Sequence, residues 1–233
     1  MKTTALLKSA TLLTAILGTQ LSGYSQLLNL NTGVAANGSG PLSYNSVEQN
    51  YNVYYSTALV SNPGVNATPW QAIAAPRTGD WIASPANAQW VSPISAADLA
   101  AGHFDPTISD PVGYFYFIEV AGFTGTFSGG FTSDNPSALF INGNFVASTP
   151  GWSTGTDQHD YLQLWSVNFS VNQGDNIEWV VDNAPNGPSG SSNPAGLLVS
   201  GTVTPVPEPA TFAFLGLGLS ALAILHRRQR FNA

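Results

Sequence analysis

The side chains that could do chemistry in this chain of 233 residues are mainly carboxylates, amides and aromatic rings, because it has no cysteine and only three histidines. His159 and Asp160 are adjacent, which does not by itself form a catalytic dyad, and no His-Glu-x-x-His motif occurs. The spacing of a carboxylate pair for glycoside hydrolysis is set by the fold, so Asp157, Asp160 and Glu178 stay open as candidates. We favour solvated surface carboxylates and predict that the protein is not an enzyme. A carbohydrate-active enzyme is the alternative.

Two Asp-Asn pairs, Asp134-Asn135 and Asp182-Asn183, each follow a stretch with β character and are expected to meet at one end of the fold. Carboxylate and amide oxygens suit Ca²⁺, which takes six to eight oxygen ligands. The same residue types also cap strand ends by bonding their own backbone. We favour capping and predict no cofactor. Calcium stays open as the alternative, and these four residues are possible ligand contacts.

The six tryptophans offer another kind of site, because aromatic rings stack on the apolar faces of sugars. Packing in the core is the competing interpretation, and we favour it for Trp165 and Trp179, which lie in strong strand patterns. Trp152 lies in the segment 150–155, which reads as a loop, so we expect its ring to be exposed. Trp152 is therefore the preferred ligand contact.

The charge distribution limits the partners of the protein. Of the six basic residues only Arg77 lies between residues 27 and 206, together with twelve of the thirteen acidic residues, a net formal charge of −11. Nucleic acid and anionic lipid need a basic surface, so this charge argues against both as partners and permits cation binding. Without cysteine, no disulfide framework can form.

Between the two chain ends, short apolar and aromatic runs alternate with Gly, Pro, Asn and Asp. The strands predicted from this pattern cover residues 27–30, 51–55, 81–82, 89–91, 113–120, 124–132, 138–141, 144–147, 161–171, 176–181 and 195–203. Asn142-Gly143 predicts a type I′ hairpin turn, residues 61–80 a long irregular connection, and residues 95–102 the one helical turn. Many short strands and almost no helix predict an all-β domain, a β-sandwich or jelly roll, over residues 26–203.

The N-terminus has the pattern of a secretory signal. Lys2 and Lys8 precede or border an apolar stretch, and Gly23 and Ser25 supply small residues for a signal peptidase. We predict a signal peptide over residues 1–25. An uncleaved membrane anchor is disfavoured because the apolar run is too short to span a bilayer.

The C-terminus combines a proline-rich spacer at 204–209, an apolar segment at 210–226 and a basic tail at 227–233. Residues 211–225 rise about 22 Å as a helix, against a hydrocarbon core of about 30 Å. Spanning becomes feasible when Ala210 is included and arginine side chains snorkel. We predict a short transmembrane helix. The basic residues Arg227, Arg228 and Arg230 place the C-terminus in the cytoplasm.

The motif Val206, Pro207, Glu208, Pro209, followed by this apolar segment and arginine end, resembles the PEP-CTERM sorting signal of Gram-negative bacteria. The resemblance implies export across the inner membrane, transient anchoring, processing by an exosortase (a membrane protease) and a final place at the cell surface or in the extracellular matrix. It also implies a link to biofilm and exopolysaccharide.

The exported part has a second resemblance. Residues 129–135, 138–143, 174–183 and 193–197 are similar to the galactose-binding-like jelly rolls often joined to this signal. We therefore expect a non-enzymatic surface or matrix protein, with polysaccharide as a possible ligand. A purely structural surface protein is a further alternative.

Overall fold

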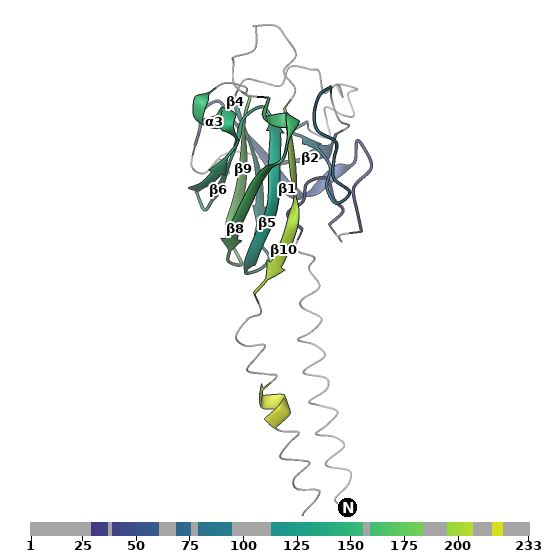
Figure 1. Ribbon diagram of the computed structural model, residues 1–233, viewed down its shortest axis with the longest axis vertical. Coiled ribbons are helices and arrows are strands. Elements are labelled where there is room, and N and C mark those ends of the chain that lie inside the picture. The colour runs from purple at the N-terminus through teal and green to yellow at the C-terminus, as the bar shows by residue number, and fades with distance from the viewer. Residues whose placement is uncertain are drawn as a thin grey trace, which may run out of the picture.

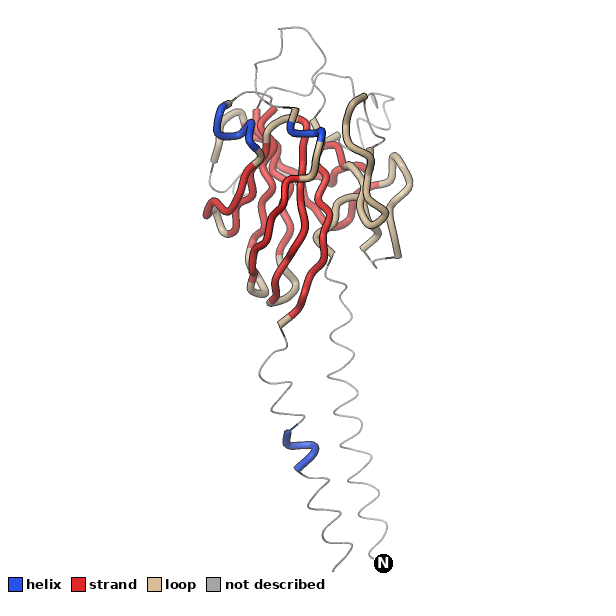
Figure 2. The backbone as a smooth tube through the Cα atoms, in the orientation of Figure 1, coloured by secondary structure: helices blue, strands red, loops and turns tan. Residues whose placement is uncertain are grey.

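The computed structural model describes residues 29–36, 39–60, 69–75, 79–94, 113–155, 159–183, 195–206 and 216–220. Strands dominate this part of the chain (Figure 2), which confirms the mostly-β prediction. The strands are β1 (Val47–Ser56), β2 (Trp70–Ala74), β3 (Val91–Ser92), β4 (Gly113–Val120), β5 (Gly125–Asp134), β6 (Ser137–Ile141), β7 (Asn144–Ser148), β8 (Trp165–Val171), β9 (Asn176–Asn183) and β10 (Gly196–Pro205). The short helices are α3 (Pro150–Thr154), the 3₁₀ turn η3 (Asp160–Leu162) and a helical piece at 216–220.

The ten strands form one antiparallel sheet in the order β7-β6-β9-β4-β1-β2-β3-β10-β5-β8. The sheet curls over on itself, because rings from strands that are not neighbours in this order touch. Trp179 of β9 packs against Phe131 of β5, with ring centroids 4.9 Å apart, and against Phe169 of β8 at 6.1 Å. The long strands β5, β8 and β10 lie side by side in Figure 1, and their inner faces cover those of β9 and β4.

The core lies between these two halves of the sheet and follows from the period-two alternation of side chains along a strand. In β4 Phe115 and Phe117 point inward, and in β9 Ile177, Trp179 and Val181 do the same; all five are buried. Burying one such side chain contributes about 1.5–3 kcal/mol to folding. A smaller cluster lies beside the main core, where the rings of Trp81 and Trp90 are 4.2 Å apart.

Several strand predictions are confirmed almost residue for residue. Strand β4 has the predicted bounds, and β9 extends its predicted strand by two residues. Strand β10 begins one residue later and ends two residues later than predicted. The predicted hairpin joins β6 and β7, and its turn residues Asn142 and Gly143 have φ of 51° and 74°. Both are positive, as a type I′ turn requires.

Other local predictions are wrong, and tertiary contacts explain why. The strand expected at 27–30 is absent from residues 29 and 30, the two that the structure describes. Here the side-chain oxygen of Asn29 accepts a hydrogen bond from the backbone amide of Asn31. Trp81-Ile82 is not a strand, since the Ile82 amide donates to the Tyr161 carbonyl of η3. Strand β2 lies inside the stretch predicted to be irregular, where Trp70 donates to the carbonyl of Pro93.

The chain ends lie mostly outside the described residues: the predicted signal peptide at 1–25, the tail at 227–233 and all of the segment 210–226 except 216–220. The predicted helical turn at 95–102, inside the chain, also lies outside them. Within the described part of the chain, no helix is long and apolar enough to cross a membrane.

Strand β10 runs further toward the C-terminus than the spacer prediction implies. It continues through Pro205, which pairs with Gly125, and the amide of Val206 still donates to the carbonyl of Thr124 at 2.9 Å. The first residues of the predicted spacer therefore belong to the sheet.

Two neighbouring carboxylates of the sheet are largely withdrawn from solvent, although the Glu119 residue as a whole is only half-buried. Glu48 is fully buried and accepts backbone amides of Gly33 and Asn50, whereas the buried Oε2 of Glu119 has no partner among the described residues. Burial raises the pKa of Glu119 well above its usual range, and the nearby Glu48 carboxylate raises it further. Burial also raises the pKa of Glu48, although the backbone amides oppose this shift.

These shifts predict that the free energy of unfolding falls as pH rises from about 4 toward 7. The unfolded chain releases the Glu119 proton near its ordinary pKa, while the folded protein still holds it, so the loss is at most about 1.4 kcal/mol per pH unit for one proton. Urea unfolding at several pH values checks this. The fall should shrink in Glu119→Gln and persist in Asp80→Asn, a surface control with the same charge change. An equal fall in Glu119→Gln contradicts the assignment.

Candidate functional site

An outer surface of the sheet gathers four aromatic side chains in and beside one pocket, three of them half-exposed and one buried. Alternation in β4 turns Tyr114 and Tyr116 away from the core, because Phe115 and Phe117 point inward. Residues opposite each other in an antiparallel pair share a face. We call this surface the aromatic face and define it by Tyr114 and Tyr116 of β4, Phe140 of β6, Trp152 of α3, and Glu178, Val180 and Asp182 of β9, which the strand register places together.

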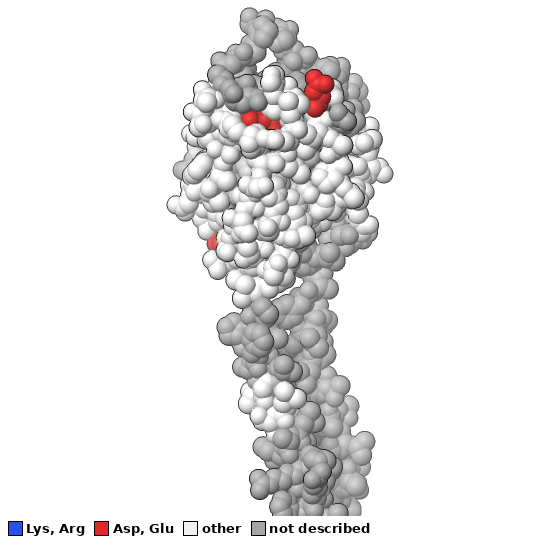
Figure 3. Space-filling model, viewed as in Figure 1, with Lys and Arg blue, Asp and Glu red and all other residues white. Residues whose placement is uncertain are grey.

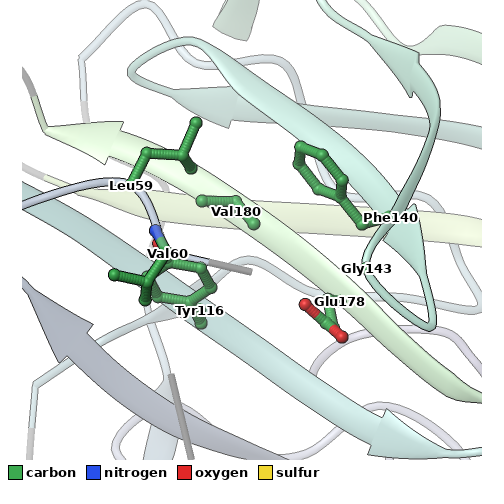
Figure 4. A pocket seen from close by; sticks show the side chains of 7 residues that line it. All are labelled: Leu59, Val60, Tyr116, Phe140, Gly143, Glu178 and Val180. Carbon is green, nitrogen blue, oxygen red and sulfur yellow. The ribbon is translucent and has the colours of Figure 1, made fainter. Parts of the chain in front are cut away.

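The aromatic face contains a pocket of about 240 Å³. Its lining (Figure 4) consists of Leu59, Val60, Tyr116, Phe140, Gly143, Glu178 and Val180. The segment after β1 is fixed over the face because the amide of Val60 donates to the Tyr116 hydroxyl at 2.7 Å. The pocket is thus mainly apolar and aromatic, with one carboxylate in its lining.

That carboxylate belongs to Glu178, which is only 5% exposed. Burial raises the pKa of Glu178, and the backbone amide of Gly143 opposes the shift by donating to the carboxylate. The β6–β7 turn brings Gly143 into place, since the Asn142 side chain accepts the amide of Asn176 at 2.8 Å and donates to Asp175. In Figure 4 the Glu178 carboxylate lies beside Gly143, inside the pocket.

Trp152 forms the rim of the face. Its ring centroid lies 6.3 Å from that of Tyr114 and 6.2 Å from that of Phe140, both in edge-to-face arrangement. The short helix α3 that carries Trp152 is held by Asp160, whose fully buried carboxylate accepts the amide of Gly151 at 3.1 Å. Asp160, a sequence candidate for catalysis, therefore lies in a structural contact that positions Trp152.

Asp182 lies opposite Tyr114 and is half-buried. Burial raises its pKa, and the pKa of Tyr114 is raised by burial first and then by the Asp182 carboxylate. The aromatic face thus has a second carboxylate beside Tyr114, whose ring in turn contacts that of Trp152.

The structure brings together only part of the two Asp-Asn pairs. The Asn135 side chain donates to the Asn183 side chain at 2.7 Å, in a buried contact between the ends of β5 and β9. Asp134 is held elsewhere, since its carboxylate accepts the Trp81 indole N–H at 2.6 Å. Among the described residues there is no group of three or more His, Cys, Asp or Glu side chains that could hold a metal ion.

Sequence reasoning missed Tyr114, Tyr116 and Phe140 as site residues. The signal was present in the run 113–120, where aromatic rings occupy consecutive positions and so must lie on both faces of a strand. Sequence reasoning also overlooked the Gly-x-Ser-x-Gly spacing of residues 151–155. An esterase elbow needs the serine on a strained strand-to-helix turn. Ser153 instead lies within α3 and donates to the Pro150 carbonyl at 3.1 Å.

Comparison with known proteins identifies the C-terminus. Residues 205–228 match the family model of the PEP-CTERM protein-sorting motif. The chain therefore carries the sorting signal of an exosortase substrate, which implies export, transient anchoring and display at the cell surface. None of the curated proteins compared with the chain matches it significantly.

Two solved structures of a beta-glucosidase from Kluyveromyces marxianus are similar to the chain, one selenomethionine-labelled and one in complex with glucose. The identities are 11% and 7%, with TM-scores of 0.34 and 0.30. Each match covers 70% of this chain, but only 18% and 16% of the glucosidase chains. A likeness at this level carries no argument about fold or activity.

Alanine substitutions of Trp152 and Trp179 should lower the free energy of unfolding by different amounts. Trp152 is half-exposed on the rim, so Trp152→Ala should lower the free energy of unfolding by about 1 kcal/mol or less. Trp179 is 0% exposed, so Trp179→Ala should cost about 3–5 kcal/mol. Urea unfolding of both variants measures this. A cost for Trp152→Ala equal to that for Trp179→Ala would make Trp152 a core residue.

Proposed function

We propose that the protein is an exported, exosortase-sorted surface protein that binds polysaccharide on its aromatic face and does not catalyse a reaction. The observation that carries this proposal is the cluster of Tyr114, Phe140 and Trp152 at the pocket that contains Glu178. Sugars present flat C–H faces to aromatic rings and hydroxyl groups to carboxylates. A face that offers both suits a sugar chain better than it suits a purely apolar ligand.

The curled sheet supports the jelly-roll interpretation of the exported domain, because its two halves pack face to face over one core. In this architecture the outer surface of a sheet is free to hold an extended ligand. Polysaccharide binding would agree with the association of PEP-CTERM proteins with exopolysaccharide and biofilm.

The spacing of the carboxylates favours binding over hydrolysis. Glu178 and Asp182 point outward from the same strand four residues apart, which is about 13 Å along β9. Glycosidases place their two carboxyl groups about 5–9.5 Å apart. Asp160, the other described candidate, is buried and bonded to the Gly151 amide.

Removing the rim tryptophan should reduce sugar binding without unfolding the protein. We expect Trp152→Ala to weaken oligosaccharide binding about tenfold, which corresponds to about 1.4 kcal/mol, because the variant loses both the stacking contact and the apolar area that the ring buries. A glycan array followed by calorimetry measures this. Tyr44→Ala, which removes an exposed aromatic ring outside this face, is the control and should bind normally. No binding by the wild-type protein to any glycan would favour the purely structural alternative.

The sorting signal has a separate test. Replacing Pro207, Glu208 and Pro209 by alanine should leave the protein in the membrane fraction, because the processing protease no longer finds its motif. Immunoblotting of membrane and released fractions measures the outcome. The wild-type protein, expressed with and without the exosortase, is the control. Release of the variant at the wild-type level would rule out exosortase processing.

A further inference from the structure

We infer that the aromatic face selects polysaccharides that carry free amino groups, with the ammonium groups bound by Glu178 and Asp182. This inference rests on the proposed function and deepens it by naming the class of sugar. It predicts that hexosamine polymers bind more tightly than N-acetylated, neutral or uronic acid polymers of the same length.

The first argument is charge complementarity. None of the six Lys and Arg residues lies within the described residues, and the face seen in Figure 3 shows acidic atoms in small separate patches. Glu178 and Asp182 therefore have no Lys or Arg partner in the described part of the chain. A net charge of −11 between residues 27 and 206 adds long-range attraction for cationic polymers and repulsion for anionic ones.

The second argument is the burial of Glu178. A carboxylate that is 5% exposed loses most of its hydration, and here one backbone amide, that of Gly143, compensates. Such a charge is costly unless it is paired and hydrogen-bonded. An ammonium group in the pocket supplies both, because it carries a positive charge and three N–H donors. An N-acetyl group supplies no charge.

The third argument comes from the rings around the carboxylates. Tyr116 and Phe140 line the pocket with Glu178. Tyr114 lies opposite Asp182, and its ring contacts that of Trp152. Cations are attracted to aromatic faces within about 6 Å, by about 0.5–2 kcal/mol. A hexosamine can place its apolar face on one ring and its ammonium between a ring and a carboxylate.

The distance between the carboxylates indicates a polymer rather than a single sugar. Glu178 and Asp182 lie about 13 Å apart along β9, so one monosaccharide cannot reach both. An extended oligomer with an amino group on each residue can contact both sites at once. Its affinity then benefits from two linked contacts.

The test compares four oligosaccharide hexamers on the full-length protein in detergent: glucosamine, N-acetylglucosamine, glucose and galacturonic acid. Calorimetry at a pH where the amino groups are charged should show the glucosamine hexamer binding at least tenfold more tightly than the others. Higher salt should weaken this binding, because the charge contacts are partly screened.

Substitutions of the two carboxylates test whether they produce the preference for amino sugars. Glu178→Gln and Asp182→Asn should each reduce the preference for the glucosamine hexamer at least fivefold, whereas Asp80→Asn, the matched surface control, should keep it. Glu178→Gln removes a buried charge, so its fold should persist, and circular dichroism verifies this. If it does not fold, Asp182→Asn decides alone.

Three outcomes overturn the inference. If all the hexamers bind equally and Trp152→Ala weakens each of them, sugar binding stands and amino-sugar selectivity is wrong. If the preference survives in both carboxylate variants, the ammonium sites lie elsewhere. If no hexamer binds, the proposed function fails together with the inference.

Discussion

The burial of Trp179 fixes the arrangement on which the candidate site depends. Its ring packs between Phe131 and Phe169 from the opposite half of the curled sheet, where it is fully buried. Because side chains alternate along a strand, an inward Trp179 forces Glu178 and Val180 outward. A register shift of one residue would exchange the two sets and place the carboxylate in the core. The same strand register therefore determines both the packing of the core and the composition of the aromatic face.

The protein combines this constraint with an unusual distribution of charge. Among its carboxylates that are withdrawn from solvent, Glu48 is bonded to backbone amides, Glu178 to that of Gly143, and the buried Oε2 of Glu119 to none of the described residues. No Lys or Arg lies among the described residues. Ordinary domains bury carboxylates rarely and usually with a partner. Glu48 and Glu119 lie within the fold, whereas Glu178 opens into the pocket. Only Glu178 of these three is thus placed to meet a ligand.

Much of the β architecture could be predicted from local pattern, and the failures have physical causes. The run 113–120 and the turn Asn142-Gly143 carry strong local signals that the fold reinforces. The short strand β2 has no such signal, because neighbouring prolines mask it and its pairing with β1 and β3 is set by the whole sheet. The site was found only in part. Trp152 was singled out because its segment was predicted to be a loop, although the structure forms the short helix α3 there. The convergence of Tyr114, Phe140 and Glu178 depends on the pairing of β6, β9 and β4, which sequence spacing does not encode.

The path of β10 has a mechanical consequence. This strand pairs with β5 along its whole length, from Gly196 opposite Asp134 to Pro205 opposite Gly125, and leads directly into the sorting signal. Inter-strand hydrogen bonds in an antiparallel pair run perpendicular to the strands. Traction at the anchored end therefore pulls along β10 and loads these bonds in shear, all together, instead of peeling them apart one by one. While the signal still anchors it, the domain therefore resists traction through the longest strand pair in its sheet.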